Sequence, residues 1–175
     1  MAMQHTPLLM SNILDRGAMV APNEEIVTLT ETGVRRQSYR ETRDRAHQLA
    51  HALAGIGIKV GDRVGTFMWN GSRHLEAYHA VAGMGAVLHT LNVRLSPKDL
   101  EYIINHAEDQ IIIVDADVLP LLEVLNGKIP TVRKIIVATE DGFEGWSTGL
   151  PDPVDYEAFI NGQPTHYEWP QIDEN

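Results

Sequence analysis

From residue 63 onward, the sequence alternates short runs of β-forming residues with stretches of helical periodicity, and this alternation leaves few folds open. The apolar run at residues 111–114 has no polar face, as is typical of an interior strand that is covered on both sides. The pattern therefore predicts an α/β fold of three layers, in which crossover helices flank a mostly parallel sheet. The expected strands are 63–68, 86–90, 110–115 and 134–138, and the expected helices are 72–84, 96–107 and 117–125.

The segment before residue 63 predicts an N-terminal β-hairpin followed by a helix. The strands at 25–30 and 34–38 are separated by a Glu-Thr-Gly turn, in which Gly33 can adopt positive φ. Ser38 and Glu41 have the spacing of a capping box, which satisfies free amides at the start of a helix. The positions that recur at helical spacing after this box are Thr42, Ala46, Leu49, Ala50 and Leu53.

Glycine and proline become frequent after residue 140, where regular structure is expected to become sparse. A short helix near residues 154–160 is the exception that the pattern allows. We therefore divide the chain into an α/β unit at residues 1–140 and a Gly/Pro-rich extension at residues 141–175.

Charge and composition exclude several classes of protein. The 14 Lys and Arg residues against 24 Asp and Glu residues give a net charge of −10, which disfavours a nucleic-acid binder. The absence of cysteine excludes disulfides, thiolate zinc sites and a thiol nucleophile. Residues 1–16 lack the pattern of a secretory signal, and no long apolar run is present to form a transmembrane segment. We therefore expect a cytoplasmic protein.

Nucleotide-loop and metal motifs are not found. The glycines at 55–57 and 83–85 lack the spacing or the position of a phosphate loop and are expected to end helices. His47 and His51 lie four residues apart, a spacing that can hold one metal ion, but they do not form an HExxH motif. Because they flank the apolar stripe of their helix, we expect them to be solvated surface residues, and we expect no metal site.

Four polar residues stand at the ends of predicted strands and helices. Ser72 and Ser96 could be read as nucleophiles, but helix N-caps are the favoured interpretation. Asp115 and Asp117 end a strand, where a carboxylate can bind a ribose or a metal. Local turn bonding of these two side chains is the favoured alternative.

The loop at residues 89–97 is the most distinctive chemically. It places Arg94 beyond the carboxyl end of a parallel strand and close to a helix N-terminus, where an anionic ligand could be held. The alternative is an Arg94 that forms an ion pair with one of the many acidic residues.

A family resemblance adds to this interpretation. It is carried by the stretches Arg73 to Tyr78, Gly83 to Lys98 and Asn105 to Asp109, with further matches at Ser38-Tyr39, Gly61 to Val64 and Trp69-Asn70. Together they closely resemble the N-terminal region of fatty-acyl-CoA synthetases, which are acyl-adenylate-forming ligases, with the medium- and long-chain bacterial enzymes nearest. The resemblance extends from about residue 8 to residue 175. It implies that the chain is an incomplete N-terminal subdomain of the adenylating-enzyme fold.

The resemblance also implies a parent reaction. Enzymes of this family use ATP and Mg²⁺ to convert a fatty acid into an acyl-adenylate and pyrophosphate, and the CoA thiol then displaces AMP. Their phosphate loop, adenosine-binding motifs and C-terminal lysine have no counterpart here. We therefore expect the chain alone to be inactive, with no catalytic residue and no cofactor of its own, and to need the remainder of a ligase polypeptide.

Two further expectations rest on the resemblance. Arg94 matches an arginine that contacts CoA phosphate in some relatives, although Val93 replaces the usual proline before it. Relatives that form homodimers through their N-terminal segments suggest the same role for residues 1–16. The alternatives to a ligase part are a dimerisation or interaction module and a stand-alone flavodoxin-like ligand-binding domain.

Overall fold

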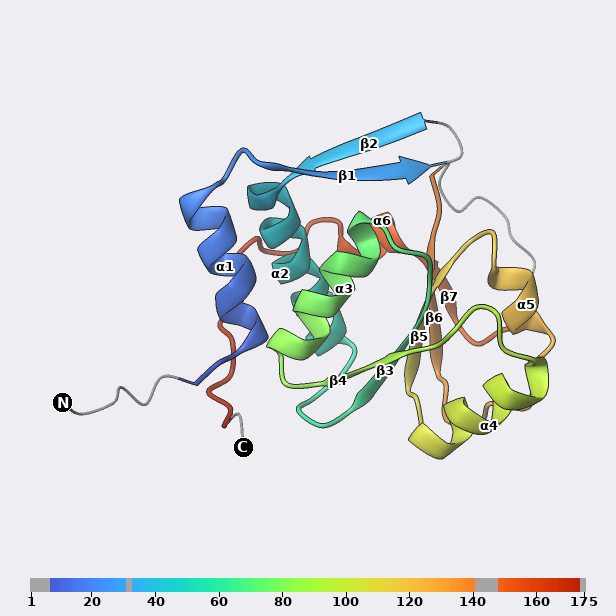
Figure 1. Ribbon diagram of the computed structural model, residues 1–175. Helices are drawn as coiled ribbons and strands as arrows, with labels where there is room; N and C mark the ends of the chain where they lie inside the picture. Colours follow the sequence, from blue (N-terminus) through green and yellow to red (C-terminus); the bar gives the residue numbers. More distant parts are fainter. Residues whose placement is uncertain (1–6, 31–32, 141–147, 174–175) are drawn as a thin grey trace.

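A five-stranded parallel sheet forms the centre of the protein, in a computed structural model that describes residues 7–30, 33–140 and 148–173 (Figure 1). The strands, in their order across the sheet, are β4 (Val87–Thr90), β3 (Arg63–Phe67), β5 (Ile111–Asp115), β6 (Lys134–Ala138) and β7 (Pro153–Asp155). All four neighbouring pairs are parallel. The predicted strands at residues 63–138 are confirmed, with ends that differ by at most one residue.

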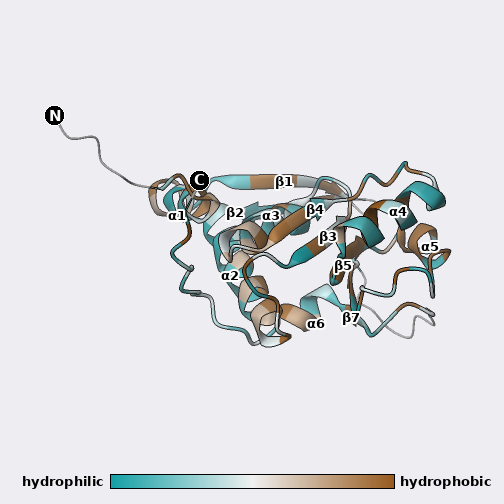
Figure 2. Ribbon diagram, turned by 90° about the horizontal axis from the view of Figure 1, so that it is seen from below, coloured by the Kyte–Doolittle hydropathy of each residue, from teal (hydrophilic) through white to brown (hydrophobic). Residues whose placement is uncertain are grey.

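Helices cover both faces of this sheet and complete three layers. The face that carries Ile111 and Ile113 packs against α2 (Tyr39–Gly55), α3 (Ser72–Gly83) and α6 (Tyr156–Ile160). The opposite face carries Ile112 and Val114 and packs against α4 (Pro97–Ala107) and α5 (Leu119–Glu123). The apolar run of β5 is therefore buried on both sides, as predicted. Figure 2 shows hydrophobic and hydrophilic residues alternating along α2 and α4, which each bury one face.

The N-terminal segment adds a hairpin and a helix to the layer of α2 and α3. Strands β1 (Glu25–Thr30) and β2 (Gly33–Ser38) pair antiparallel and lie across the top of this layer in Figure 1. The hairpin was predicted, and Gly33 has the positive φ that its turn position requires. Helix α1 (Met10–Val20) packs against α2 and α3 and was not predicted. No side chain caps it and its ends carry no complementary charge, so the usual signals are missing.

The prediction of a helix near residues 154–160 is wrong at its start. Residues 153–155 form β7, because they pair with β6 at the edge of the sheet. The helix begins only at Tyr156, where Asp155 caps it by accepting a hydrogen bond from the Ala158 amide. A three-residue strand leaves no readable period in the sequence, so the sheet edge alone specifies it.

Two predicted helix caps have different outcomes. Ser96 caps α4, since its hydroxyl accepts from the Asp99 amide at 3.2 Å. Ser72 does not cap α3, because Gly71 occupies the N-cap position and offers no side chain. The Ser72 hydroxyl is buried, and no hydrogen-bond partner is found for it among the described residues. The Ser72 prediction was therefore one residue out of place.

Substituting Ser38 and Ser72 separately tests this difference. Ser38 forms the complete capping box with Glu41, so Ser38→Ala is expected to lower the free energy of unfolding by about 1 kcal/mol. Ser72→Ala removes a buried hydroxyl that makes no bond, so it is expected to leave stability unchanged or slightly higher. Urea titrations of both variants provide the measurement. A larger loss for Ser72→Ala than for Ser38→Ala would contradict this assignment of the caps.

Candidate functional site

The order of the strands locates a crevice between β3 and β5. The chain passes from β3 outward to β4 on one side, and then returns to place β5 on the other side of β3. Connections that leave neighbouring strands in opposite directions open a crevice at the strands' carboxyl ends, where open α/β sheets bind ligands. A hollow of about 440 Å³ lies at this position. Its lining includes Thr28 of β1, Asp115 at the end of β5, Arg73 of α3 and, in the loops after the strands, Trp69, Asp117 and Glu140.

Trp69 connects the ends of β3 and β5 across the hollow. Its backbone N–H donates to the Asp115 carboxylate at 2.7 Å, and its indole Nε1–H donates to Asp117 at 2.8 Å. The sequence favoured local turn bonding for both aspartates, and this is wrong because their partner, Trp69, is 46 residues from Asp115 and 48 from Asp117. Side-chain bonds of such long range cannot be inferred from spacing along the chain.

Burial raises the pKa of Asp115 to about 6. The neighbouring charge of Asp117 also raises it, whereas the hydrogen bond from the Trp69 amide opposes the shift. The hollow therefore contains a carboxyl group that changes its charge close to neutral pH.

This pKa predicts how stability depends on pH. Because the Asp115 pKa is about 6 in the folded chain and about 4 in an unfolded one, the folded state binds more protons between these values. Stability is therefore expected to fall as the pH rises through this range. Asp115→Asn, whose amide oxygen still accepts from Trp69, should weaken this dependence. Carbon-13 NMR of the carboxyl group gives its midpoint directly, and an ordinary aspartate midpoint would contradict the prediction.

The arginines beside the hollow are held by ion pairs. Arg73 donates to Glu157 and to Glu140, each at 2.8 Å, and Arg35 donates to Glu140 at 2.6 Å. Burial disfavours the charge of Arg73, but its bonds to Glu157 and Glu140 outweigh this effect and raise its pKa. These contacts connect the hairpin, α3 and α6 behind the site.

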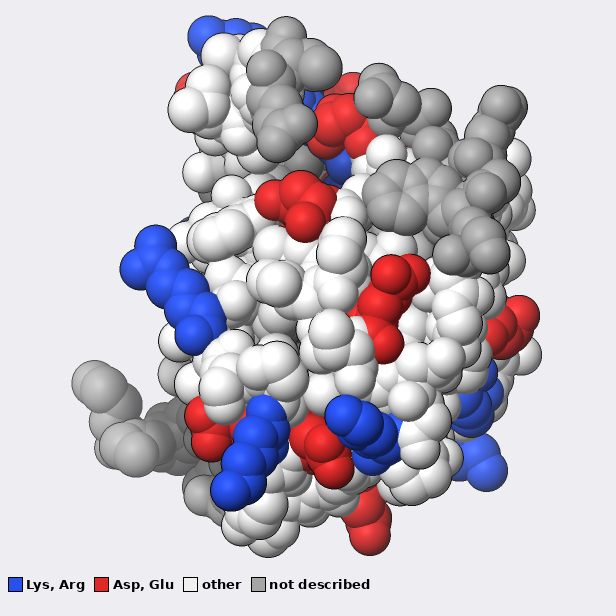
Figure 3. Space-filling model, turned by 90° about the vertical axis from the view of Figure 1, so that its right-hand side faces the viewer, with Lys and Arg blue, Asp and Glu red and all other residues white. Residues whose placement is uncertain are grey.

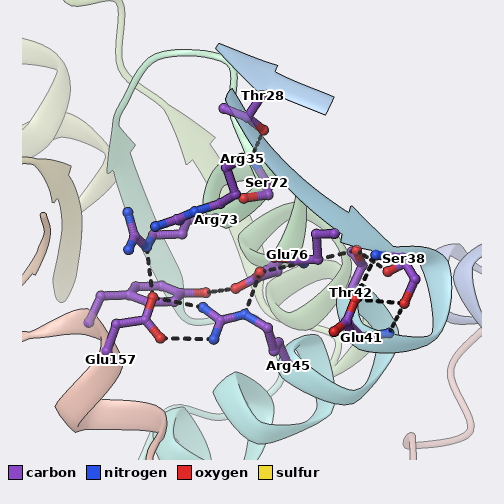
Figure 4. A network of polar contacts seen from close by, with 12 residues as sticks. Thr28, Arg35, Ser38, Glu41, Thr42, Arg45, Ser72, Arg73, Glu76 and Glu157 are labelled. Carbon is purple, nitrogen blue, oxygen red and sulfur yellow. Dashed lines mark hydrogen bonds and ion pairs between the residues drawn. The ribbon is translucent and has the colours of Figure 1, made fainter. Parts of the chain in front are cut away.

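A buried carboxylate extends this network into the core (Figure 4). Glu76 is fully buried and accepts hydrogen bonds from Gln37 at 2.8 Å, Arg45 at 2.7 Å and the Tyr156 hydroxyl at 2.7 Å. Burial and the adjacent Glu76 raise the pKa of Tyr156 well above its usual value, so the phenol remains a donor. Arg45 also forms two bonds to Glu157. Four elements, β2, α2, α3 and α6, are thus joined around one charge.

Arg94 lies apart from the hollow. It is exposed in the loop after β4, the edge strand of the sheet, and its amide donates to Asn92 Oδ1 at 2.9 Å. Among the described residues, none of the ion pairs includes Arg94. His89, which lies in β4 itself, pairs with buried Asp109 at 2.8 Å. The alternative prediction, in which Arg94 forms an ion pair with an acidic residue, is therefore not supported by the described residues.

The hollow was not predicted from the sequence, because its lining residues come from separate segments. The signal was present in Trp69-Asn70-Gly71 after one strand and in Asp115 and Asp117 after another. What the sequence left open was the order of the strands. Only that order places these two strand ends next to each other.

The prediction for His47 is wrong as well. It was expected on the surface, but only 2% of it is exposed, because α1 and the segment after α6 cover this side of α2. His51, one turn further on, is partly buried and bonded to the His166 carbonyl at 2.7 Å. Within residues 7–30, 33–140 and 148–173, no three His, Asp or Glu side chains are grouped as metal ligands.

Charged side chains of both signs occur together on the surface. On the face seen in Figure 3, acidic and basic side chains are scattered among uncharged ones, without a field of positive charge. In the part of the chain that the structure describes, no helix has the length and apolar character needed to cross a membrane.

Comparisons with known proteins agree with the resemblance noted in the sequence. A family model described as AMP-binding enzyme matches residues 14–169. A long-chain-fatty-acid–CoA ligase of Thermus thermophilus is 47% identical over 136 residues, which are 77% of this chain and 25% of that protein. A medium-chain-fatty-acid–CoA ligase of Ectopseudomonas oleovorans is 34% identical over 174 residues, covering 99% of this chain and 32% of that protein.

A solved structure supports the same relationship. The anthranilate CoA ligase AuaEII in complex with anthranoyl-AMP superposes with a TM-score of 0.82 and 26% identity, over 96% of this chain and 31% of that one. The chain thus spans about a quarter to a third of the length of these relatives. The predicted fold class and the resemblance to adenylating ligases are both confirmed. Because the family model covers most of the sequence, the chain belongs to the AMP-binding enzyme family.

Proposed function

We propose that this chain forms the N-terminal part of a fatty-acid–CoA ligase. The match of residues 14–169 to the AMP-binding enzyme model is the observation that carries the proposal, and the named ligase relatives support it. In the parent reaction, a fatty-acid carboxylate oxygen attacks the α-phosphate of ATP and pyrophosphate leaves, with Mg²⁺ balancing charge on the phosphates. The CoA sulfur then attacks the acyl carbon, and AMP leaves with the bonding electrons.

In this proposal the chain acts as a scaffold with one ligand contact. Its residues provide no group for the adenylation step, so we expect no turnover from the chain alone. Arg94 is assigned to a phosphate of CoA, because it is an exposed guanidinium in a strongly acidic chain and makes no ion pair with a described residue. Residues 141–175 are assigned to the connection toward the phosphate-loop strand of the longer enzyme.

A chimera tests the proposal. The chain replaces the matching N-terminal part of the Thermus thermophilus ligase, and pyrophosphate release is measured with ATP, palmitate or octanoate, and CoA. The chimera should turn over, and the chain alone should not. Arg94→Ala in the chimera should raise KM for CoA and leave KM for ATP unchanged, whereas Lys98→Ala, another exposed cation near this loop, should change neither. A folded but inactive chimera, or activity of the chain alone, would overturn the proposal.

The hollow between β3 and β5 supports a second candidate, a stand-alone flavodoxin-like ligand-binding domain. Its position at the strands' carboxyl ends and the uncapped start of α3 beside it favour a small polar ligand such as a mononucleotide. Calorimetric titration of the chain with AMP should then give saturable heat that Asp117→Asn weakens. The absence of heat removes this candidate and leaves the ligase proposal in place.

We also propose that the chain is cytoplasmic and forms homodimers through its N-terminal segment. Helix α1 supports the dimer, because Met10, Ile13, Met19 and Val20 are all exposed on it. Light scattering should give twice the monomer mass, and Ile13→Asp should reduce it to that of the monomer. A monomer at all concentrations would contradict the dimer and the related interaction-module alternative.

A further inference from the structure

The segment after α6 is held to the helical layer by side chains of other elements. Residues 163–169, here called the C-terminal strap, form no helix or strand and run beside α1 and α2 (Figure 1). The Gln163 carbonyl accepts from Gln48 at 3.1 Å, and the His166 carbonyl bonds with His51 Nε2 at 2.7 Å. Because the strap lacks a backbone ladder, its position depends on such side-chain contacts.

Trp169 fixes the far end of the strap. Its indole Nε1–H donates to Asp15 Oδ2 of α1 at 3.1 Å, and its ring lies against Gly83 of α3. A Cβ on Gly83 would approach the indole within 2.8 Å, so the ring occupies the space that a side chain would need. The strap therefore has one closely fitted docked position on α1, α2 and α3.

His47 bonds to the centre of the strap, and its ring does so in a single protonation state. The Tyr167 amide donates to His47 Nδ1 at 2.7 Å, so Nδ1 carries no proton while the strap is docked. The ring proton is then on Nε2, which faces Asp15 Oδ1 at 3.1 Å. The buried imidazole is thus neutral and makes both of its bonds.

A second proton on this ring opposes docking. It can only enter at Nδ1, where it would point at the Tyr167 N–H and leave two donors facing each other. The bond that holds the strap is then lost, whereas the new charge is stabilised by Asp15. Protonation therefore favours a state in which Tyr167 has moved away from the ring.

The other titratable groups around His47 do not reverse this effect. His51 Nε2 faces a carbonyl oxygen, so the charged ring can still donate there. His166 of the strap stacks on His47 at 5.8 Å, and a charge on it adds repulsion. His79 of α3 is buried near Asp15, and burial lowers its pKa. The nearby carboxylate, Asp15, belongs to α1 and remains in place when the strap leaves.

We propose that His47 is a pH-sensitive latch, which holds the C-terminal strap when its ring is neutral and releases it when Nδ1 is protonated. Docking is therefore expected to weaken when a lower pH places a proton on Nδ1, because the Tyr167 amide then loses its acceptor. The inference does not depend on the proposed ligase function.

Hydrogen exchange of the 175-residue chain tests the latch. After correction for the intrinsic pH dependence of exchange, the Tyr167 amide, which donates to His47 Nδ1, should lose protection at least tenfold between about pH 7.5 and about pH 5.5. Amides of β5 should keep theirs, which separates local release from unfolding. In His47→Asn, the amide oxygen can accept at the place of Nδ1 but does not titrate, so strap protection should not vary with pH. His106→Gln, at an exposed histidine of α4, should behave like the unmodified chain.

A second measurement needs no variant. Nitrogen-15 NMR of the unmodified chain should show His47 as the Nε2–H tautomer at about pH 7.5, and the Tyr167 amide should shift with the midpoint of this ring. An Nδ1–H tautomer, a strap whose protection is independent of pH, or a His47→Asn strap that keeps the pH dependence would each overturn the latch.

Discussion

Replacing Glu76 by alanine is expected to lower the free energy of unfolding by about 3–5 kcal/mol, as for other buried ion pairs that lose one partner. The carboxylate is fully buried and accepts from Gln37, Arg45 and Tyr156. Its removal leaves three donors without their acceptor, one of which is a largely buried guanidinium. Urea denaturation followed by circular dichroism provides the measurement.

The matched control is Glu25→Ala. Glu25 also pairs with an arginine, Arg36, but both side chains are about half exposed, so the expected loss is within about 0.5 kcal/mol. Glu76→Gln should fall between the two, because the amide oxygen can still accept but the charge that balances Arg45 is gone. Equal losses for Glu25→Ala and Glu76→Ala would show that burial of the network contributes nothing to stability.

The second large effect is expected at Phe67, where alanine should cost about 3–5 kcal/mol. The ring is fully buried at the end of β3 and packs in the cluster that contains Leu91, Leu100 and Val114. Its loss creates a cavity between the sheet and α4, which a rigid sheet cannot close by collapsing.

Leu121→Ala is the control for Phe67→Ala. This side chain is half exposed on α5, so its truncation removes little buried area and should change stability by less than about 0.5 kcal/mol. Thermal unfolding of both variants reports the difference. A Phe67→Ala variant as stable as Leu121→Ala would mean that the packing between β3 and α4 is loose.

Local patterns predicted most of the sheet and its helices correctly. The apolar run at 111–114 indicated β5 at the centre, because only a strand covered on both faces can be apolar on both. The capping box of Ser38 and Glu41 located the start of α2, since both partners lie within one helical turn. Helix α1 carried no such signal, and its position depends on packing against α2 and α3.

Residues that act at long range were predicted poorly. His47 was expected in solvent, because its position beside the apolar stripe of α2 says nothing about α1 and the C-terminal strap that cover it. The partners of Asp115 and Asp117 were missed for the same reason, since Trp69 reaches them from another strand end. The outcome for Arg94 is different: its exposure agrees with a loop after an edge strand, and its role stays a prediction.

The sequence by itself determined the alternation of strands and helices, the main helix caps and the family resemblance, because each is encoded by residues close together or by motifs that need no partner. Only the tertiary structure decided the order of the strands, the hollow between β3 and β5, the network around Glu76 and the burial of His47. These features depend on contacts between residues far apart in the chain, whose side chains become neighbours only when the sheet and its covering helices have assembled.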